Sequence, residues 1–340
     1  MSADRSWMPR LASRPELGAV GGLLVVTLFF AATADPAMFT PAGVMNVLSP
    51  AAQLGILAVG AGLLMIAGEF DLSIGSMVAF AGMVFAAVLV VWDAPLPIAI
   101  LLTFAFAISV GAFNAQIVLK TGLPSFIVTL ASLFILRGLT LVGLKWATGG
   151  STQLRGVREA VDGSWGLQIF SGDALAGIAG PGIPVEVIWF VAVALVGAFV
   201  LARMRFGNWI LAAGGDAQAA RNSGVPVSDV KAVLFMVTAC CAALVAILTV
   251  LDAGSTDARR GFQKEFEAII AAVIGGCLLT GGFGSIVGAF FGSIIFGMVV
   301  IGLTYTDVDH DWYQVFLGAM LMLAVLFNNF VRQRATGERS

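Results

Sequence analysis

A succession of long apolar runs restricts the fold of this sequence more than any other feature. The hydrocarbon core of a bilayer is about 30 Å thick, so a helix needs roughly 20 apolar residues to cross it. Ten stretches approach or reach that length and are predicted to be spanning helices. They lie near residues 17–34, 47–67, 74–92, 96–118, 124–145, 186–202, 230–251, 266–280, 285–304 and 313–331.

The pair at 266–304 is the least regular of these. Its first run is short, and Thr280-Gly281-Gly282-Phe283-Gly284 separates it from the second run. Clusters of glycine interrupt helices. The pair is therefore compatible either with two full spans or with a re-entrant hairpin, and the sequence leaves both open.

Composition indicates the same class of protein. Of 340 residues, 59% are hydrophobic and 11% are charged, whereas a soluble domain carries about 25% charged residues. We therefore expect an all-α polytopic membrane protein, with a single transmembrane domain over residues 1–340. The formal net charge of −2 gives no reason to expect a nucleic-acid partner.

The distribution of lysine and arginine predicts the orientation, because short cytoplasmic loops carry an excess of these residues. The excess falls on segments 1–16, 203–229 and 332–340, so we place these segments and both termini in the cytoplasm. The loop at 146–185 is then outside. Five predicted spans precede this outer loop and five follow it, so the two halves have opposite topology. Inverted halves are frequent among transporters, although the sequence shows little direct evidence of a repeat.

Motifs that would indicate an enzyme are absent. None of the four lysines follows a glycine, so the phosphate-binding motif G-x-x-x-x-G-K-[ST] is missing and this chain alone is not expected to hydrolyse ATP. No H-E-x-x-H or G-x-S-x-G occurs. The single histidine, His310, lies among Asp307, Asp309 and Asp311, where we favour a solvated turn or a partner contact over a metal site. We expect no metal and no cofactor on this chain.

Arg203 to Lys231 is the longest polar interruption in the second half of the sequence. Within it, Asp216 is a suitable N-cap, the five residues that follow are good helix formers, and Gly224 is a natural stop. The pattern predicts a short helix held between two spans. We interpret such a helix as a docking element rather than a passive connector.

Charged residues beside hydrocarbon are costly and are retained mainly where they face water, protein or a pathway. Glu69 and Asp71 lie at the junction between the second and third predicted spans. Asp71 is suited to cap the helix that begins near Ser73. Glu69 has no such role. Glu69, Asp71 and Ser73 are the candidate pathway or gate residues at this junction.

Two further candidates lie within spans. Arg137 falls inside the fifth span, where we expect an interior partner, either Glu69 or Asp71, or a water-filled cavity. Asn114 lies near the inner end of the fourth span. It is suited to a polar pathway or to a hydrogen bond between helices.

Four stretches occur in a defined order along the chain. They are Gly68–Ser76, Leu123–Leu130 with Arg137–Gly138, Arg203–Lys231, and Ala272–Gly276 followed by Gly281–Ser285. In this order they resemble the permease subunits of bacterial ATP-binding-cassette importers for monosaccharides, the ribose and xylose type. The resemblance extends from about residue 17 to 334. The family usually has glycine where this chain has Glu69, so the resemblance assigns no role to that side chain.

The resemblance implies a fold similar to the cobalamin-importer permease, with ten helices in two inverted five-helix halves. It implies a multi-pass protein of the bacterial inner membrane that moves a monosaccharide or related polyol. The implied partners are a second permease copy, an extracytoplasmic sugar-binding protein, membrane lipid, and a cytoplasmic ATPase subunit that binds ATP and Mg. The residues implied in coupling to the ATPase are Gly215, Asp216, Ala219, Ala220, Arg221, Ser223 and Gly224.

Two other classes of protein are weighed against this interpretation. An ion-coupled secondary transporter would carry ionisable residues deep in several spans, and Arg137 is the one clear example here. An integral-membrane enzyme would need a nucleophile, a metal cluster or an acid–base pair, and the sequence presents none that is recognisable. The sequence does not identify the sugar.

Overall fold

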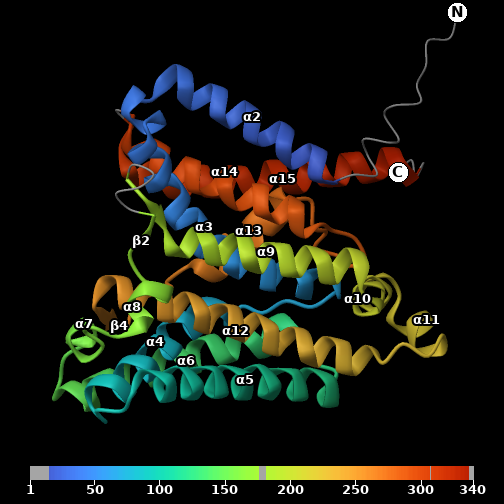
Figure 1. Ribbon diagram of the computed structural model, residues 1–340. Helices are drawn as coiled ribbons and strands as arrows, with labels where there is room; N and C mark the ends of the chain where they lie inside the picture. The colour runs from blue at the N-terminus through green and yellow to red at the C-terminus, as the bar shows by residue number, and fades with distance from the viewer. Residues whose placement is uncertain (1–14, 176–180, 307, 337–340) are drawn as a thin grey trace, which may run out of the picture.

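The structure, a computed structural model, describes residues 15–175, 181–306 and 308–336 and consists mainly of long helices (Figure 1). Seven helices are long and apolar enough to cross a membrane. They are α2 (Pro15–Thr33), α3 (Pro41–Ile66), α5 (Leu96–Thr121), α6 (Ser125–Thr148), α9 (Val185–Arg203), α12 (Val227–Ala253) and α14 (Ile286–Thr304). The expected class, an all-α polytopic membrane protein, is therefore confirmed.

Three other helices fall in the remaining predicted spans. α4 (Ile74–Val90) and α15 (Tyr313–Thr336) contain shorter apolar segments, and α13 (Lys264–Ile274) has 11 residues. At 1.5 Å per residue, α13 rises about 16 Å, roughly half the thickness of the hydrocarbon core. The prediction of a helix over 266–280 was therefore wrong in extent. The apolar sequence continues to Leu279, but the backbone leaves the helix at Gly275, and Gly276 adopts a φ of 90°.

Caps set several of the helix ends. The Thr40 hydroxyl accepts the amide hydrogen of Gly43 at the start of α3, and the Ser285 hydroxyl does the same for Gly288 in α14. Gly122 and Gly254 end α5 and α12 in the left-handed conformation that glycine adopts without strain. The helix α15 continues to Thr336, so the first residues of the predicted tail at 332–340 are helical. Most of the predicted tail at 1–16 lies outside the described residues.

The predicted outer loop at 146–185 contains short ordered elements that the sequence did not indicate. They are β1 (Gln153–Arg155), α7 (Val157–Ala160), α8 (Trp165–Phe170), β2 (Asp173–Ala174) and β3 (Ile183–Pro184). β1 pairs antiparallel with β4 (Ser255–Asp257), which follows α12, and β2 pairs with β3. The outer loop is thus joined to the far half of the chain.

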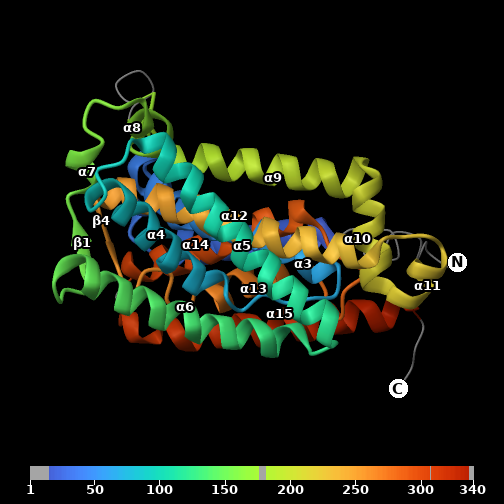
Figure 2. The ribbon, with the colours of Figure 1, turned by 90° about the horizontal axis from the view of Figure 1, so that it is seen from below.

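The long helices run side by side, and the short elements gather at their two ends (Figure 1). The helices α10 (Arg205–Gly215) and α11 (Ala217–Asn222) lie at one end, where α2 begins and α15 ends. The helices α7 and α8 lie at the opposite end, with β2 and β4. Among the seven candidate spans, α3 and α12 are the most enclosed, whereas α2 exposes most of its surface. Figure 2 shows α6 and α15 along one side of the molecule, with α13 beside them.

Candidate functional site

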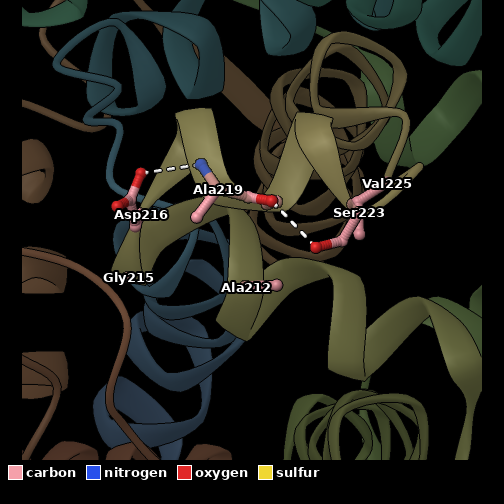
Figure 3. Close-up of a pocket in the computed structure, with 7 residues that line it drawn as sticks. Ala212, Gly215, Asp216, Ala219, Ser223 and Val225 are labelled. Atoms are coloured by element: carbon pink, nitrogen blue, oxygen red, sulfur yellow. Dashed lines mark hydrogen bonds between the residues drawn. The ribbon is translucent and has the colours of Figure 1, made fainter.

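The polar segment between α9 and α12 folds into two short helices, of which the sequence predicted the second. The Asp216 carboxylate caps α11 by accepting the amide hydrogens of Gln218 and Ala219, both at 2.9 Å. Figure 3 shows the contact with Ala219. Gly224 follows the helix with a φ of 84°. The expected short helix is therefore present, with its expected cap. The helix α10 was missed, because Arg205–Gly215 was assigned to the polar interruption and a helix was expected only from Asp216 onward.

A shallow depression of about 330 Å³ opens beside α11 (Figure 3). Its lining is mostly small, and it consists of Ala212, Gly215, Asp216, Ala219, Ala220, Ser223 and Val225. Five of the seven predicted coupling residues line it. The other two, Arg221 and Gly224, are exposed beside it. An open hollow lined by small side chains suits a projection from another protein better than it suits a small polar solute, which needs convergent polar groups.

Beneath this depression, three segments meet backbone to backbone, and we call this contact the glycine junction. It joins Gly214 at the end of α10, Ile66–Gly68 at the end of α3, and Gly281–Gly282 between α13 and α14. The Gly282 amide donates to the Ile66 carbonyl at 2.8 Å. A Cβ on Gly214 would overlap that same carbonyl oxygen, and a Cβ on Gly281 would lie 2.8 Å from the Cα of Gly68. The junction therefore requires glycine.

The linker between α3 and α4 is held by a buried polar network. The Asp71 carboxylate accepts both the amide hydrogen and the hydroxyl hydrogen of Ser73, at 2.8 and 2.5 Å. Asn114 of α5 donates to the Ser73 hydroxyl at 3.2 Å and accepts from the Ser132 hydroxyl of α6 at 2.5 Å. Asp71 thus binds Ser73 itself rather than the first-turn amides of α4. Burial raises the pKa of the Asp71 carboxyl to about 6, and the two hydrogen bonds from Ser73 lower it by less than burial raises it.

The same linker is fixed to the start of α6. The Ser125 hydroxyl accepts the amide hydrogen of Phe70, and the Thr129 hydroxyl accepts that of Leu72, both at 3.0 Å. These contacts bring three predicted site residues, Asp71, Ser73 and Asn114, into one cluster. Since every one of these polar groups has a partner, the cluster fixes the backbone of the linker.

Glu69 lies apart from that cluster and pairs with Lys231. The Lys231 ammonium lies 2.5 Å from the Glu69 carboxylate, and both side chains are mostly buried. Lys231 is the fifth residue of α12, shortly after α11. The expectation that Glu69 or Asp71 would pair with Arg137 was therefore wrong. The sequence could not show that Glu69 pairs with Lys231, because the two residues are 162 positions apart.

Arg137 instead pairs with a residue that the sequence analysis did not single out. Its Nη2 lies 2.7 Å from the Glu265 carboxylate, on the first turn of α13. Glu267 lies in the same turn of α13. Its carboxylate binds Lys264 of that turn at 2.6 Å and the Tyr313 hydroxyl of α15 at 3.0 Å. The polar sequence before α13 looks like an ordinary outer loop. Only the folded chain shows that it packs along α4, with Thr256 against Gly82 and Glu265 against Gly75.

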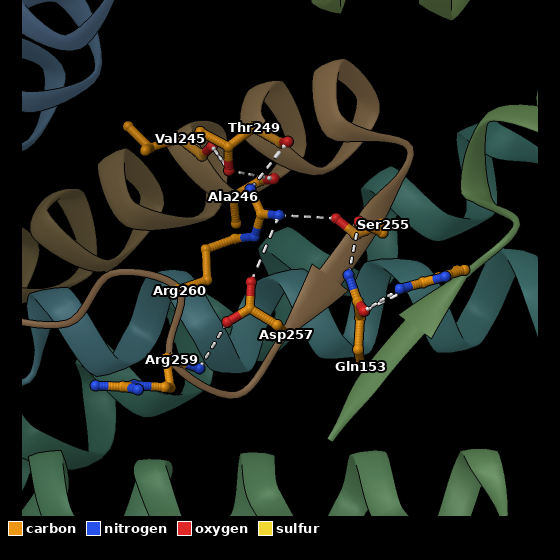
Figure 4. A network of polar contacts seen from close by, with 9 residues as sticks. Gln153, Val245, Ala246, Thr249, Ser255, Asp257, Arg259 and Arg260 are labelled. Atoms are coloured by element: carbon orange, nitrogen blue, oxygen red, sulfur yellow. Dashed lines mark hydrogen bonds and ion pairs between the residues drawn. The ribbon is translucent and has the colours of Figure 1, made fainter. Parts of the chain in front are cut away.

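At the opposite end of the bundle, Arg260 fastens the turn after α12 (Figure 4). Its guanidinium donates to the backbone carbonyls of Thr249 and Ser255 at 3.0 and 2.9 Å and lies 3.7 Å from the Asp257 carboxylate. These bonds hold β4 against the last turn of α12. Within the part of the chain that the structure describes, no three His, Cys, Asp or Glu side chains form a group able to hold a metal ion.

Comparison with known proteins places these features in a family of transporters. The family described as "Branched-chain amino acid transport system / permease component" matches residues 43–325. The xylose transport system permease protein XylH of Escherichia coli (strain K12) is 32% identical to this chain, covering 93% of the chain and 92% of XylH. The ribose import permease protein RbsC of the same strain is 31% identical, covering 90% and 91%.

A third relative in that strain is the probable ABC transporter permease protein YphD, which is 30% identical over 94% of this chain and 91% of its own. The matches extend over nearly the whole length of each protein. No solved structure matches the chain significantly.

Proposed function

Because this chain belongs to the family of transport-system permease components that includes the xylose and ribose permeases, we propose that it is the membrane-spanning subunit of an ATP-driven importer. The solute is a monosaccharide or a related polyol. The chain is a translocation subunit and not an enzyme, so a separate ATPase subunit binds ATP and Mg and supplies the energy. An extracytoplasmic sugar-binding protein delivers the solute.

The observation that carries the proposal beyond family membership is the position of α11. It is a capped helix with an exposed arginine, beside an open hollow lined by small residues, at the end of the bundle. We propose that this surface docks on the ATPase subunit. Beneath this surface, the glycine junction puts the end of α10 in direct backbone contact with the linkers after α3 and α13.

The same proposal includes a topology. The helices α2–α6 make one half and α9 with α12–α15 the other, ten helices in inverted halves, as in the cobalamin-importer permease. The short α13 takes part together with the non-helical residues on either side of it. Both termini and α11 lie in the cytoplasm, and the loop at 146–185 lies outside. Two copies of the chain, embedded in the lipid of the bacterial inner membrane, form the complete pathway.

The five candidate pathway residues divide by their surroundings. Asp71, Ser73 and Asn114 are buried and fully bonded, and Glu69 is paired with Lys231. We propose that these four hold the α3–α4 linker in position beside the pathway. Arg137, whose side chain is 30% exposed, is the one that faces the solute.

Reconstitution tests the proposal. The chain is placed in liposomes with the ATPase subunit and the binding protein that its genome encodes beside it, and uptake of labelled xylose and ribose is measured. Uptake should require ATP, persist when ionophores collapse the ion gradients, and stop when the P-loop lysine of the ATPase is replaced. Uptake driven by an ion gradient without ATP would instead establish the alternative, an ion-coupled secondary transporter.

Docking through α11 has its own test. We expect Arg221→Glu and Gly224→Trp each to abolish uptake while the protein still reaches the membrane, because both change the exposed surface beside the hollow. Arg158→Glu, the same charge reversal at the opposite end of the bundle, serves as the control and should leave ATPase co-purification unchanged. Normal uptake and normal ATPase co-purification in both α11 variants would contradict the docking role.

A further inference from the structure

Arg137 lies at the middle of α6, too far from either end of the helix to reach water along it. Twelve residues separate it from Ser125 and eleven from Thr148, which at 1.5 Å per residue is about 18 and 16 Å. An arginine side chain cannot extend that far to a membrane surface. Its side chain is nevertheless 30% exposed. A charged group at this depth faces water or protein rather than lipid, so this side of α6 is not a lipid surface.

An aromatic ring covers the Arg137 guanidinium on this same side. The Cζ of Arg137 lies 5.0 Å from the ring centre of Phe262, and the Cζ of Arg259 lies 5.9 Å from it. Half of Phe262 is exposed, and Arg259 is exposed as well. The successive turns between β4 and α13 carry both side chains. We call the group of Arg137, Arg259 and Phe262 the Arg–Phe wall.

Glu265 neutralises the charge of Arg137 in the wall. It is almost completely buried, and one carboxylate oxygen binds Nη2 of Arg137 at 2.7 Å. Its other oxygen is packed against Gly75 and has no hydrogen-bond partner among the described residues. The pair cancels the charge of Arg137 but leaves its Nε and Nη1 donors without a partner in the described part of the chain. At Arg137 the wall therefore offers hydrogen-bond donors without the full charge of an unpaired cation.

This combination matches the surface of a sugar. A sugar ring has hydroxyl oxygens around its edge, which guanidinium donors bind, and an apolar C–H face, which stacks on an aromatic ring. A pathway must also bind its solute weakly enough to release it. A half-exposed ring beside an arginine that is already paired with a carboxylate meets this requirement. We propose that the Arg–Phe wall lines the water-filled pathway and contacts the sugar in transit. This inference rests on the proposed function for the identity of the solute.

Cysteine labelling tests whether the wall faces water. Single cysteines are introduced by Arg259→Cys and Phe262→Cys in a transporter whose Cys240, Cys241 and Cys277 have been replaced by alanine. Both residues belong to the wall and both are exposed. Phe113→Cys on α5 is the control, since Phe113 is 57% exposed on a helix without such charges nearby. A membrane-impermeant thiol reagent should label the first two at least tenfold faster than the third.

Transport kinetics test contact with the sugar. We expect Phe262→Ala to lower kcat/KM for ATP-driven xylose or ribose uptake at least tenfold, while Phe262→Tyr retains at least half of it. The ATPase activity stimulated by the binding protein should change less than twofold in both variants. Phe113→Ala, the matched removal of an exposed aromatic ring, should leave both measurements unchanged. A merely structural role for Phe262 would instead lower uptake and stimulated ATPase activity together.

The outcomes separate the two proposals. Slow labelling at both wall positions, equal to that of Phe113→Cys, overturns the wall even if the transporter imports sugar normally. Normal kcat/KM in Phe262→Ala overturns it as well. If the wild-type complex imports no sugar under ATP but the wall cysteines react rapidly, the proposed function fails and the water-facing position of the wall stands.

Discussion

At the scale of single residues, the glycine junction depends on the absence of one carbon atom. A Cβ on Gly214 would overlap the Ile66 carbonyl oxygen and lie 2.6 Å from the Gly282 nitrogen, whereas a Cβ on the neighbouring Gly215 meets no atom within 4 Å. All of these contacts are backbone, which cannot rotate away. The two adjacent glycines therefore form a matched pair for mutation.

We expect Gly214→Ala to lower the stability of the detergent-purified protein by at least about 2 kcal/mol, the typical cost of forcing extra atoms into a packed site. Gly215→Ala should stay within about 0.5 kcal/mol of the parent protein. Thermal unfolding followed by size-exclusion chromatography measures both. Equal melting temperatures for the two variants would show that the three segments are not packed as described.

The buried pair of Glu69 and Lys231 is a second residue-scale feature with a measurable coupling. Removing one charge leaves the other buried and unpaired, which costs about 3 kcal/mol or more. We expect Glu69→Gln and Lys231→Gln each to lower the melting temperature, and the double variant to recover at least half of the loss. Strictly additive effects in this double-mutant cycle would show that the pair does not form.

At the scale of elements, α11 depends on its cap because it is only six residues long. A helix this short has little intrinsic stability. We expect Asp216→Ala, which loses both amide contacts at a cost of about 1 kcal/mol, to weaken binding of the ATPase subunit several-fold in a pull-down titration. Asp216→Ser, which keeps a capping oxygen, should bind close to normally. Weakening by both variants alike would point to the carboxylate charge rather than to the cap.

Sequence reasoning located most elements but not the contacts between them. The ends of α9 and α12 follow apolar run lengths, and the cap and stop of α11 are local, so Asp216 and Gly224 were sufficient to predict it. The end of α13 depends on where the backbone turns within an apolar stretch, which composition does not show. The partners of Glu69 and Arg137 are distant in sequence, so the fold alone brings them together.

At the scale of the whole molecule, the expected topology places α7 and α11 on opposite sides of the membrane. Glu159 and Gln218 are exposed at the two ends of the bundle. In intact spheroplasts, an impermeant reagent should label Glu159→Cys at once and Gln218→Cys only after the membrane is broken open. The reverse order of labelling would invert the proposed orientation, and with it the location of the ATPase.

The two halves of the chain depend on each other at both ends of the bundle. β1 from the first half pairs with β4 from the second, and the glycine junction joins α3 to α10 and to the residues after α13. The apolar runs predict ten separate helices, but they carry no information on these cross-links. Pairing of β1 with β4 and contact at single glycines are properties of the assembled backbone.

The shortness of α13 has a consequence for how the protein is made. A helix of 11 residues with charged Lys264, Glu265 and Glu267 in its first turn does not enter a bilayer unaided as it leaves the ribosome. Its charges contact Arg137 on a helix synthesised earlier and Tyr313 on a helix synthesised later. The contact between Glu267 and Tyr313 therefore forms only after α15 has been synthesised. A chain that stops before α15 leaves the Glu267 carboxylate with Lys264 as its remaining side-chain partner among the described residues.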